Sequence, residues 1–93
     1  MTHAEALILA REIATNHPNV RAYCRHYGFK PSTVLARAFR AGVNLGAAVR
    51  ACRVQETEQY AALHRVSLGR AALDTSWSTP SSFYRARRSV SHV

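Results

Sequence analysis

Apolar residues recur along this chain at helical spacing, and no window alternates apolar and polar positions for long. Thr2 and Glu5 form a capping-box pattern, which opens a first helix. The apolar positions of that helix are Leu7, Leu9, Ala10 and Ile13. The segment Asn16-His17-Pro18-Asn19 ends it, because proline lacks an N–H donor and biases the preceding residue away from the helical conformation.

The same start and stop signals predict the later helices. Their ranges are 20–27 before Gly28, 31 to about 41 before Gly42 and Asn44, 45–64, a short helix opened by Ser67 that runs to about 75, and a last helix that begins at Pro80-Ser81. The 45–64 helix is the longest, with one expected apolar stripe of Leu45, Val49, Cys52, Tyr60 and Leu63, interrupted by Glu56. The pattern therefore predicts an all-α fold of about six to seven helices.

Composition supports one small helical domain over residues 1–93. The chain has 93 residues and is 47% hydrophobic, but many of its apolar residues are alanines, which bury little area each. No apolar run is long enough to span a membrane, and no basic segment precedes the apolar N-terminal stretch as in a secretory signal. Two cysteines without such a signal are expected to be reduced thiols. We therefore expect a cytoplasmic, nucleoid-associated protein.

Charge changes the picture more than composition does. Thirteen basic residues, nearly all of them arginines, stand against five acids and give a net charge of +8 and a pI near 10.8. The planar guanidinium suits phosphates and guanine edges, so this excess favours a polyanionic partner. A basic but inert surface is the alternative that charge alone leaves open.

An internal repeat gives a more specific signal. The segment GFKPSTVLARAFR (28–40) aligns with SWSTPSSFYRARR (76–88) at a separation of 48 positions. The pairs are Val20 with Leu68, Cys24 with Ala72, Phe29 with Trp77, Leu35 with Phe83, Arg37 with Arg85, Ala38 with Ala86 and Arg40 with Arg88. Each copy reads as a short helix, a tight turn and a second helix with a basic face, which is the plan of a helix-turn-helix.

Each paired position has an expected structural role. Small residues at Cys24 and Ala72 would let two helices cross closely, and the aromatic ring at Phe29 or Trp77 would fill the corner between them. The side chain at Leu35 or Phe83 would anchor the second helix to the core. The hydroxyls of the first turn, at Ser32, Thr33, Ser81 and Ser82, would either cap the helix or meet bases and phosphates.

The stretch from Val20 to Arg88 resembles the DNA-binding domain of AraC/XylS-type transcription regulators. The resemblance rests on SWSTPSSFYRARR, which is similar to the family's second motif at Trp77, Phe83, Arg85 and Arg88, and on GVNLGAAVRACRVQETEQYAAL, which resembles its linker helix. It implies an opening helix and first helix-turn-helix over 1–44, a linker helix over 45–64 and a second helix-turn-helix over 65–93. Two departures are Ser76 in place of the family's glycine and Arg87 in place of a core phenylalanine.

The resemblance implies two recognition helices in successive major-groove segments of a promoter, in a regulator that acts without its own ligand domain and is expected to be an activator that contacts RNA polymerase. Carried over by position, the base-contact candidates are Ser32, Thr33, Arg37, Ser81, Ser82, Tyr84 and Arg85, with Arg37 and Arg85 foremost. The phosphate candidates are Lys30, Arg40, Ser78, Arg87 and Arg88. Any single arginine among them is alternatively a solvated surface charge.

Other chemistry is not indicated. Cys24 and Cys52 lack the spacing of a zinc site and are expected in the core, and the histidines form no metal or catalytic motif, so we expect neither a metal, a cofactor nor an enzyme. Two alternatives to the regulator remain. One is a protein-binding module of the same fold that docks on a second regulatory protein, and the other is an architectural DNA-binding protein of a mobile element.

Overall fold

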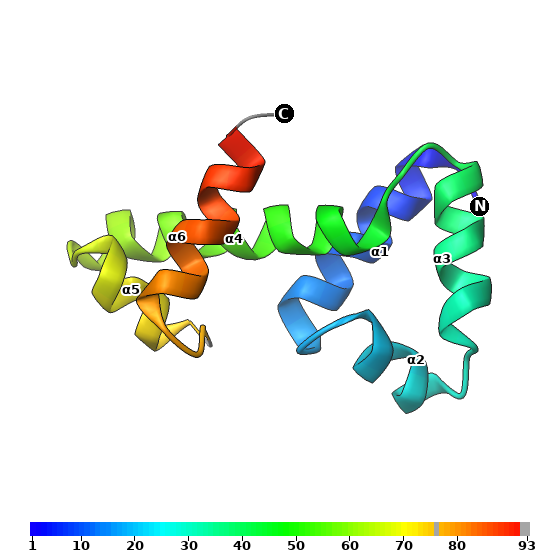
Figure 1. Cartoon of the computed structure of the whole chain (residues 1–93), viewed down its shortest axis with the longest axis horizontal. Coiled ribbons are helices and arrows are strands. Elements are labelled where there is room, and N and C mark those ends of the chain that lie inside the picture. The colour runs from blue at the N-terminus through cyan, green and yellow to red at the C-terminus, as the bar shows by residue number, and fades with distance from the viewer. Residues whose placement is uncertain (76, 92–93) are drawn as a thin grey trace. The chain divides into compact units, whose positions relative to one another are not determined.

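The computed structural model describes residues 1–75 and 77–91, and this part of the chain contains six α-helices and no strand (Figure 1). The helices are α1 (His3–Asn16), α2 (Val20–Tyr27), α3 (Pro31–Arg40), α4 (Leu45–His64), α5 (Leu68–Asp74) and α6 (Pro80–Ser91). The all-α prediction is confirmed, and the predicted helix ends agree to within a residue or two. Ser76, the departure in the second turn, lies outside the described residues, as do His92 and Val93.

Local capping explains why the helices begin where they do. In α1 the Thr2 hydroxyl accepts from the Glu5 N–H at 3.1 Å, while the Glu5 carboxylate accepts from the Thr2 N–H at 2.9 Å, so the capping box is formed. The Asn19 side chain caps α2 by accepting a hydrogen bond from the Ala22 N–H at 2.8 Å. The Ser67 hydroxyl caps α5 by accepting from the Arg70 N–H at 3.2 Å. These two capping residues lie 48 positions apart, so the repeat extends to the start of its first helix.

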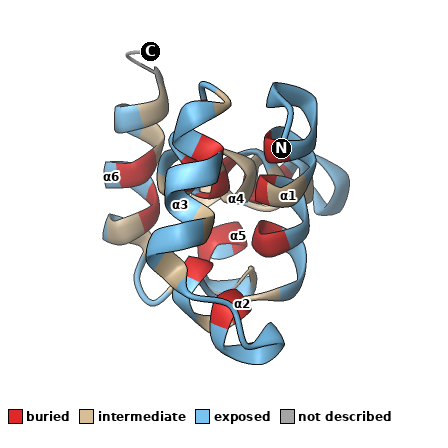
Figure 2. Cartoon of the chain, turned by 90° about the vertical axis from the view of Figure 1, so that its right-hand side faces the viewer, coloured by how far each residue is buried: buried red, intermediate tan, exposed pale blue. Residues whose placement is uncertain are grey.

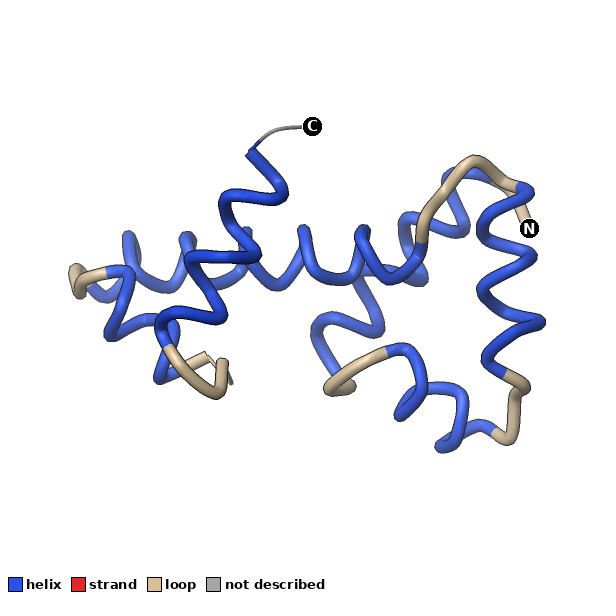
Figure 3. The backbone as a smooth tube through the Cα atoms, in the orientation of Figure 1, coloured by secondary structure: helices blue, strands red, loops and turns tan. Residues whose placement is uncertain are grey.

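The chain divides into two compact units, Met1–Cys52 and Arg53–Val93. The boundary falls inside α4, which is one continuous helix in Figure 3, so each unit includes part of it. Unit 1 contains α1, α2 and α3, and unit 2 contains α5 and α6. In each unit the two helices that a short turn connects contact each other. These pairs are α2 with α3 and α5 with α6.

The core of unit 1 is built mainly from small side chains. Its buried members are Ala6, Ala10, Ile13, Ala14, Val20, Tyr23, Cys24, Ala38, Val43, Leu45 and Val49. The full burial of Cys24 agrees with the expected close approach of α2 to its neighbours. Among the residues of α3 only Ala38 is fully buried, and Val34 packs against the cluster, as does Ala41 directly after the helix. Most of α3 is therefore exposed (Figure 2).

Unit 2 has a smaller core around Phe83. Val54, Ala72, Phe83 and Ala86 are buried, and Leu68, Trp77 and Val90 pack against them. Thr57 is the one buried polar residue of the described core, and its hydroxyl accepts the indole N–H of Trp77 at 2.9 Å. The Trp77 ring meets Phe83 edge-on with centroids 5.6 Å apart, so this aromatic fills its corner as expected.

The single apolar stripe expected for the longest helix is wrong. The buried residues of α4 are Leu45 and Val49 in unit 1 and Val54, Thr57 and Ala61 in unit 2, while Leu63 is 78% exposed. Residues on one helix face are three or four positions apart, but Val49 and Val54 are five positions apart, so the buried face changes between them. A helix that contributes to two separate cores need not keep one stripe throughout.

Candidate nucleic-acid interface

The candidate residues of the first repeat copy all reach solvent. Lys30, Ser32, Thr33, Arg37 and Arg40 are exposed, at or near the start of α3 and along it. Lys30 is the N-cap residue but makes no side-chain capping bond, and Pro31 occupies the first helical position. The first-turn hydroxyls of α3 are therefore not its helix caps.

In the second copy, two of the candidates are engaged by the protein itself. Ser78, Ser81, Tyr84, Arg85 and Arg88 are exposed. Ser82 is half-buried, its N–H donates to Thr79 Oγ1 at 3.1 Å, and the two hydroxyls lie 2.9 Å apart. The Arg87 guanidinium donates to Glu58 of α4 at 3.3 Å. Arg87, which stands where the family has a core phenylalanine, thus ties α6 to α4 through an ion pair.

Two of the core roles assigned to the first copy are wrong. Leu35 was expected to anchor α3 but is 40% exposed, while Val34 and Ala38 face the core. Phe29 was expected to fill the corner but is 51% exposed. Its ring stacks on Tyr27, with centroids 6.0 Å apart, and lies 6.2 Å from the ring of the buried Tyr23.

The exposure of Leu35 follows from a one-residue difference in register between the two copies, which begins after Phe29 and Trp77. Up to the turn, equivalent residues of the two copies are 48 residues apart. The Phe29 N–H donates to Cys24 O, and the Trp77 N–H donates to Ala72 O in the same way. Lys30 alone then separates Phe29 from Pro31, whereas Ser78 and Thr79 separate Trp77 from Pro80. The second turn therefore has one extra residue, which a constant offset cannot accommodate.

Beyond the turn, equivalent residues of the two copies are 49 residues apart. Both second helices begin with Pro-Ser, at Pro31 and Pro80. The N–H of the fourth residue, Val34 or Phe83, bonds to the carbonyl of the residue before the proline in both. Val34 and Phe83 are thus equivalent anchors, and Leu35 corresponds to Tyr84, with 40% and 41% exposure.

The new register changes which residues share a position. Arg85 corresponds to Ala36, Arg88 to Phe39 and Arg37 to the buried Ala86. At about 3.6 residues per turn, Arg85 and Arg88 lie on the side of α6 that faces away from its core. Arg37 lies beside the buried face of α3, and Arg40 lies nearer the outward side.

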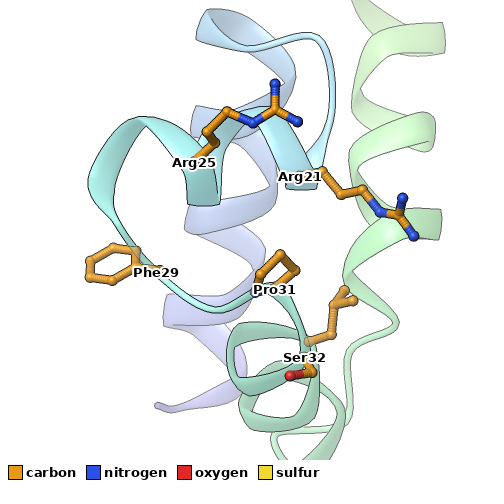
Figure 4. Close-up of a pocket in the computed structure, with 6 residues that line it drawn as sticks. Arg21, Arg25, Phe29, Pro31 and Ser32 are labelled. Carbon is orange, nitrogen blue, oxygen red and sulfur yellow. The ribbon is translucent and has the colours of Figure 1, made fainter.

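The structure adds two arginines that the sequence reasoning missed. Arg21 and Arg25 of α2 border a cavity of about 620 Å³ whose other walls are Phe29, Pro31, Ser32 and Leu35 (Figure 4). The cavity lies at the start of α3, where the positive end of the helix dipole favours an anion. Their signal in the sequence was an arginine pair at i and i+4 on one short helix.

The segment that carries α2 and α3 has no carboxylates of its own, and the acids of unit 1 are Glu5 and Glu12 of α1. No acidic residue occurs from Ile13 to Gln55, a stretch that includes all of α2 and α3. The ion pairs of Arg70 with Asp74 and of Arg87 with Glu58 both lie in unit 2. The positive charge of α2 and α3 is therefore not neutralised by carboxylates of their own segment.

The Cys24 thiol is buried in the core of unit 1. Burial raises the pKa of the Cys24 thiol, which keeps it protonated. No group of three or more potential metal ligands occurs among the described residues. None of the helices described here combines the length and apolar character needed to cross a bilayer.

Comparisons of the chain with models of known protein families, with curated proteins and with solved structures found no match.

Proposed function

We propose that the chain is a sequence-specific double-stranded DNA-binding regulator of transcription, similar to the AraC/XylS type, with α3 and α6 as its recognition helices. The observation that carries the proposal is the repeated helix pair. In both copies the second helix begins with Pro-Ser, packs its fourth residue toward a core and exposes the opposite side. A helix held in this way by a short turn is the element that enters a major groove in helix-turn-helix proteins.

The chemistry of the exposed side supports DNA over other polyanions. Arg85 stands on the outward face of α6 between Ser81 and Arg88, so a guanidinium can reach a guanine edge while its neighbours meet phosphates. In unit 1, the cavity bordered by Arg21 and Arg25 and the start of α3 would hold a backbone phosphate. Phosphate contacts position the helices, and base contacts supply the sequence preference.

One observation favours the alternative of a protein-binding module. Phe39 is 76% exposed on α3 and Leu63 is 78% exposed on α4, and exposed apolar side chains of this size are common where proteins dock. The dense positive charge around α3 and the matched arginines of α6 give the DNA-binding function the stronger support.

Selection of bound duplexes from a random pool, followed by titration of the best one and of a scrambled one at two salt concentrations, tests the proposal. We expect a preference of roughly a thousandfold or more for the selected duplex and an affinity that falls steeply with salt. Arg85→Ala should cost about 1–3 kcal/mol on the selected duplex only, whereas Arg88→Ala should weaken both duplexes alike.

Arg11→Ala is the matched control, because it removes the same charge from an exposed position on α1. If Arg85→Ala and Arg11→Ala weaken binding equally, α6 reads no sequence. If no duplex is enriched over the pool, DNA binding is only a charge effect and a protein partner becomes the function to pursue.

A further inference from the structure

The two proposed recognition helices present different chemistry on their outward faces. At equivalent positions α6 carries Tyr84, Arg85 and Arg88, while α3 carries Leu35, Ala36 and Phe39. This difference is hidden when residues 48 apart are compared, because that alignment pairs arginine with arginine. It appears when the second helices are compared at their structural separation of 49 residues. The face of α3 is therefore apolar where the face of α6 is cationic.

The apolar face of α3 is solvent-exposed and contiguous. Phe39 is 76% exposed and Leu35 is 40% exposed, and the two lie one helical turn apart on adjoining sides. Ala36 lies on the other side of Phe39 and is also exposed. Leu35 also borders the cavity at the start of the helix, next to the exposed ring of Phe29. Phe39 is thus the most exposed member of this surface, and Leu35 and Phe29 are each about half covered by unit 1.

The surroundings of the apolar face indicate what partner fits it. Arg21 and Arg25 border the same cavity, and Lys30 and Arg40 are exposed at the two ends of α3. No acid occurs anywhere from Ile13 to Gln55. An apolar centre bordered by arginines and a lysine is complementary to a surface with apolar groups between rows of negative charge. The major groove of DNA has this arrangement where thymine C5-methyl groups lie between the two phosphate backbones.

We infer that α3 recognises thymine methyl groups through Leu35 and Phe39, with the cations at its rim held on the flanking phosphates. The inference rests on the proposed DNA-binding function and specifies its chemistry. The target site is then asymmetric in composition: the part that α3 meets carries thymines, and the part that α6 meets carries guanines read by Arg85. Ala36 leaves room for the methyl groups where a longer side chain would fill the space.

Deoxyuridine in place of thymine tests the inference, because it removes the methyl group and leaves the base pairing unchanged. In the selected duplex, thymines are replaced one at a time and the affinity of the full chain is measured. We expect about a three- to fivefold loss at each contacted thymine, which is the value of burying about one methyl group. Phe39→Ala or Leu35→Ala should bind the thymine duplex more weakly and lose its discrimination against the deoxyuridine duplex.

Leu63→Ala is the matched control, because Leu63 is as exposed as Phe39 but lies on α4. It should keep both the affinity and the deoxyuridine effect. The inference is overturned if no thymine shows a methyl effect, or if the effect persists unchanged in both α3 variants. In either case a selected duplex that still depends on Arg85 would leave the proposed function standing and would assign the apolar face to a protein. Failure to enrich any duplex would overturn both.

Discussion

The indole N–H of Trp77 donates to the buried hydroxyl of Thr57 over 2.9 Å, and this bond joins the turn between α5 and α6 to the middle of α4. The Thr57 hydroxyl lies 2.7 Å from the Thr75 hydroxyl, which donates to Ala71 O at 2.7 Å. These groups form a series of close polar contacts from Trp77 through Thr57 to Thr75, and the Thr57 hydroxyl also lies 3.1 Å from Arg53 O, to which it can donate. All its members lie in unit 2, where α6 must be held for its outward face to be presented.

Thr57→Val should destabilise the protein by about 1–3 kcal/mol, because it keeps the shape of the side chain but leaves a partly buried indole N–H without its acceptor. Denaturation followed by the fluorescence of Trp77, the single tryptophan, measures this directly. Thr33→Val makes the same change at an exposed position of α3 and should stay within about 0.5 kcal/mol of the parent. Equal stability of the two variants would show that the hydroxyl chain contributes nothing.

The register of α3 can be tested by a pair of neighbouring truncations. Val34→Ala removes a side chain packed on the core and should cost about 1–2 kcal/mol. Leu35→Ala removes a larger but exposed side chain and should cost less than about 0.5 kcal/mol. Thermal unfolding by circular dichroism checks both. A larger loss of stability for Leu35→Ala than for Val34→Ala would show that Leu35 is the anchor and that the second helices also align at a separation of 48 residues.

Gly42 should not tolerate a side chain. It has φ +83° after α3, and a Cβ there would lie 3.3 Å from the His3 ring, whose Nδ1 is 2.9 Å from Ala41 O. Gly42→Ala is expected to cost about 1–2 kcal/mol from the left-handed backbone alone. Gly46→Ala is the contrasting change, since its Cβ would meet only ordinary contacts inside α4, and it should stabilise by about 0.5–1 kcal/mol. Melting temperatures that shift in the same direction would contradict this account.

The capping box of α1 predicts a pH dependence. Hydrogen bonds from Thr2, first from its backbone and then from its side chain, lower the pKa of Glu5 below its ordinary value of 4.5. A carboxylate whose pKa is lowered by folding stabilises the native state above its unfolded pKa and loses that effect as the pH falls through the folded value. Glu5→Gln should therefore melt below the parent at neutral pH.

The difference between Glu5→Gln and the parent should shrink as the pH falls below 4.5, which a series of melts at decreasing pH measures. Glu12→Gln, on the same helix but outside the box, serves as the control for charge. A gap that stays constant down to the acid limit would show that the box does not depend on ionised Glu5.

The sequence predicted the helices because their ends are local events. Thr2 with Glu5, Asn19, Gly28 and Ser67 act on N–H groups or backbone angles within a few residues. The same holds for the charge distribution: the acid-free stretch from Ile13 to Gln55 needs no coordinates to be seen. The repeated helix pair was also visible, since Val20 and Leu68, Cys24 and Ala72, and Phe29 and Trp77 stand 48 residues apart.

The packing faces required the tertiary structure. One extra residue before Pro80 shifts the residues of α6 by one position relative to an alignment with a constant separation of 48. Each position corresponds to about 100° around a helix, so the shift changes which residues are assigned to the core and which to solvent. Leu35 and Val34 are adjacent apolar residues, so composition could not choose the anchor between them. Arg21 and Arg25 became part of a candidate site only when α2 and the start of α3 enclosed one cavity.

The sequence by itself thus determined the helix content, the helix limits, the net charge and the existence of two copies of one unit, because each depends on neighbouring residues or on sums over the chain. Only the tertiary structure decided that Phe39 is exposed, that Arg87 pairs with Glu58 and that Thr57 accepts from Trp77. Those relationships join residues far apart in the chain, and they depend on side-chain volumes filling a common core, which no local pattern records.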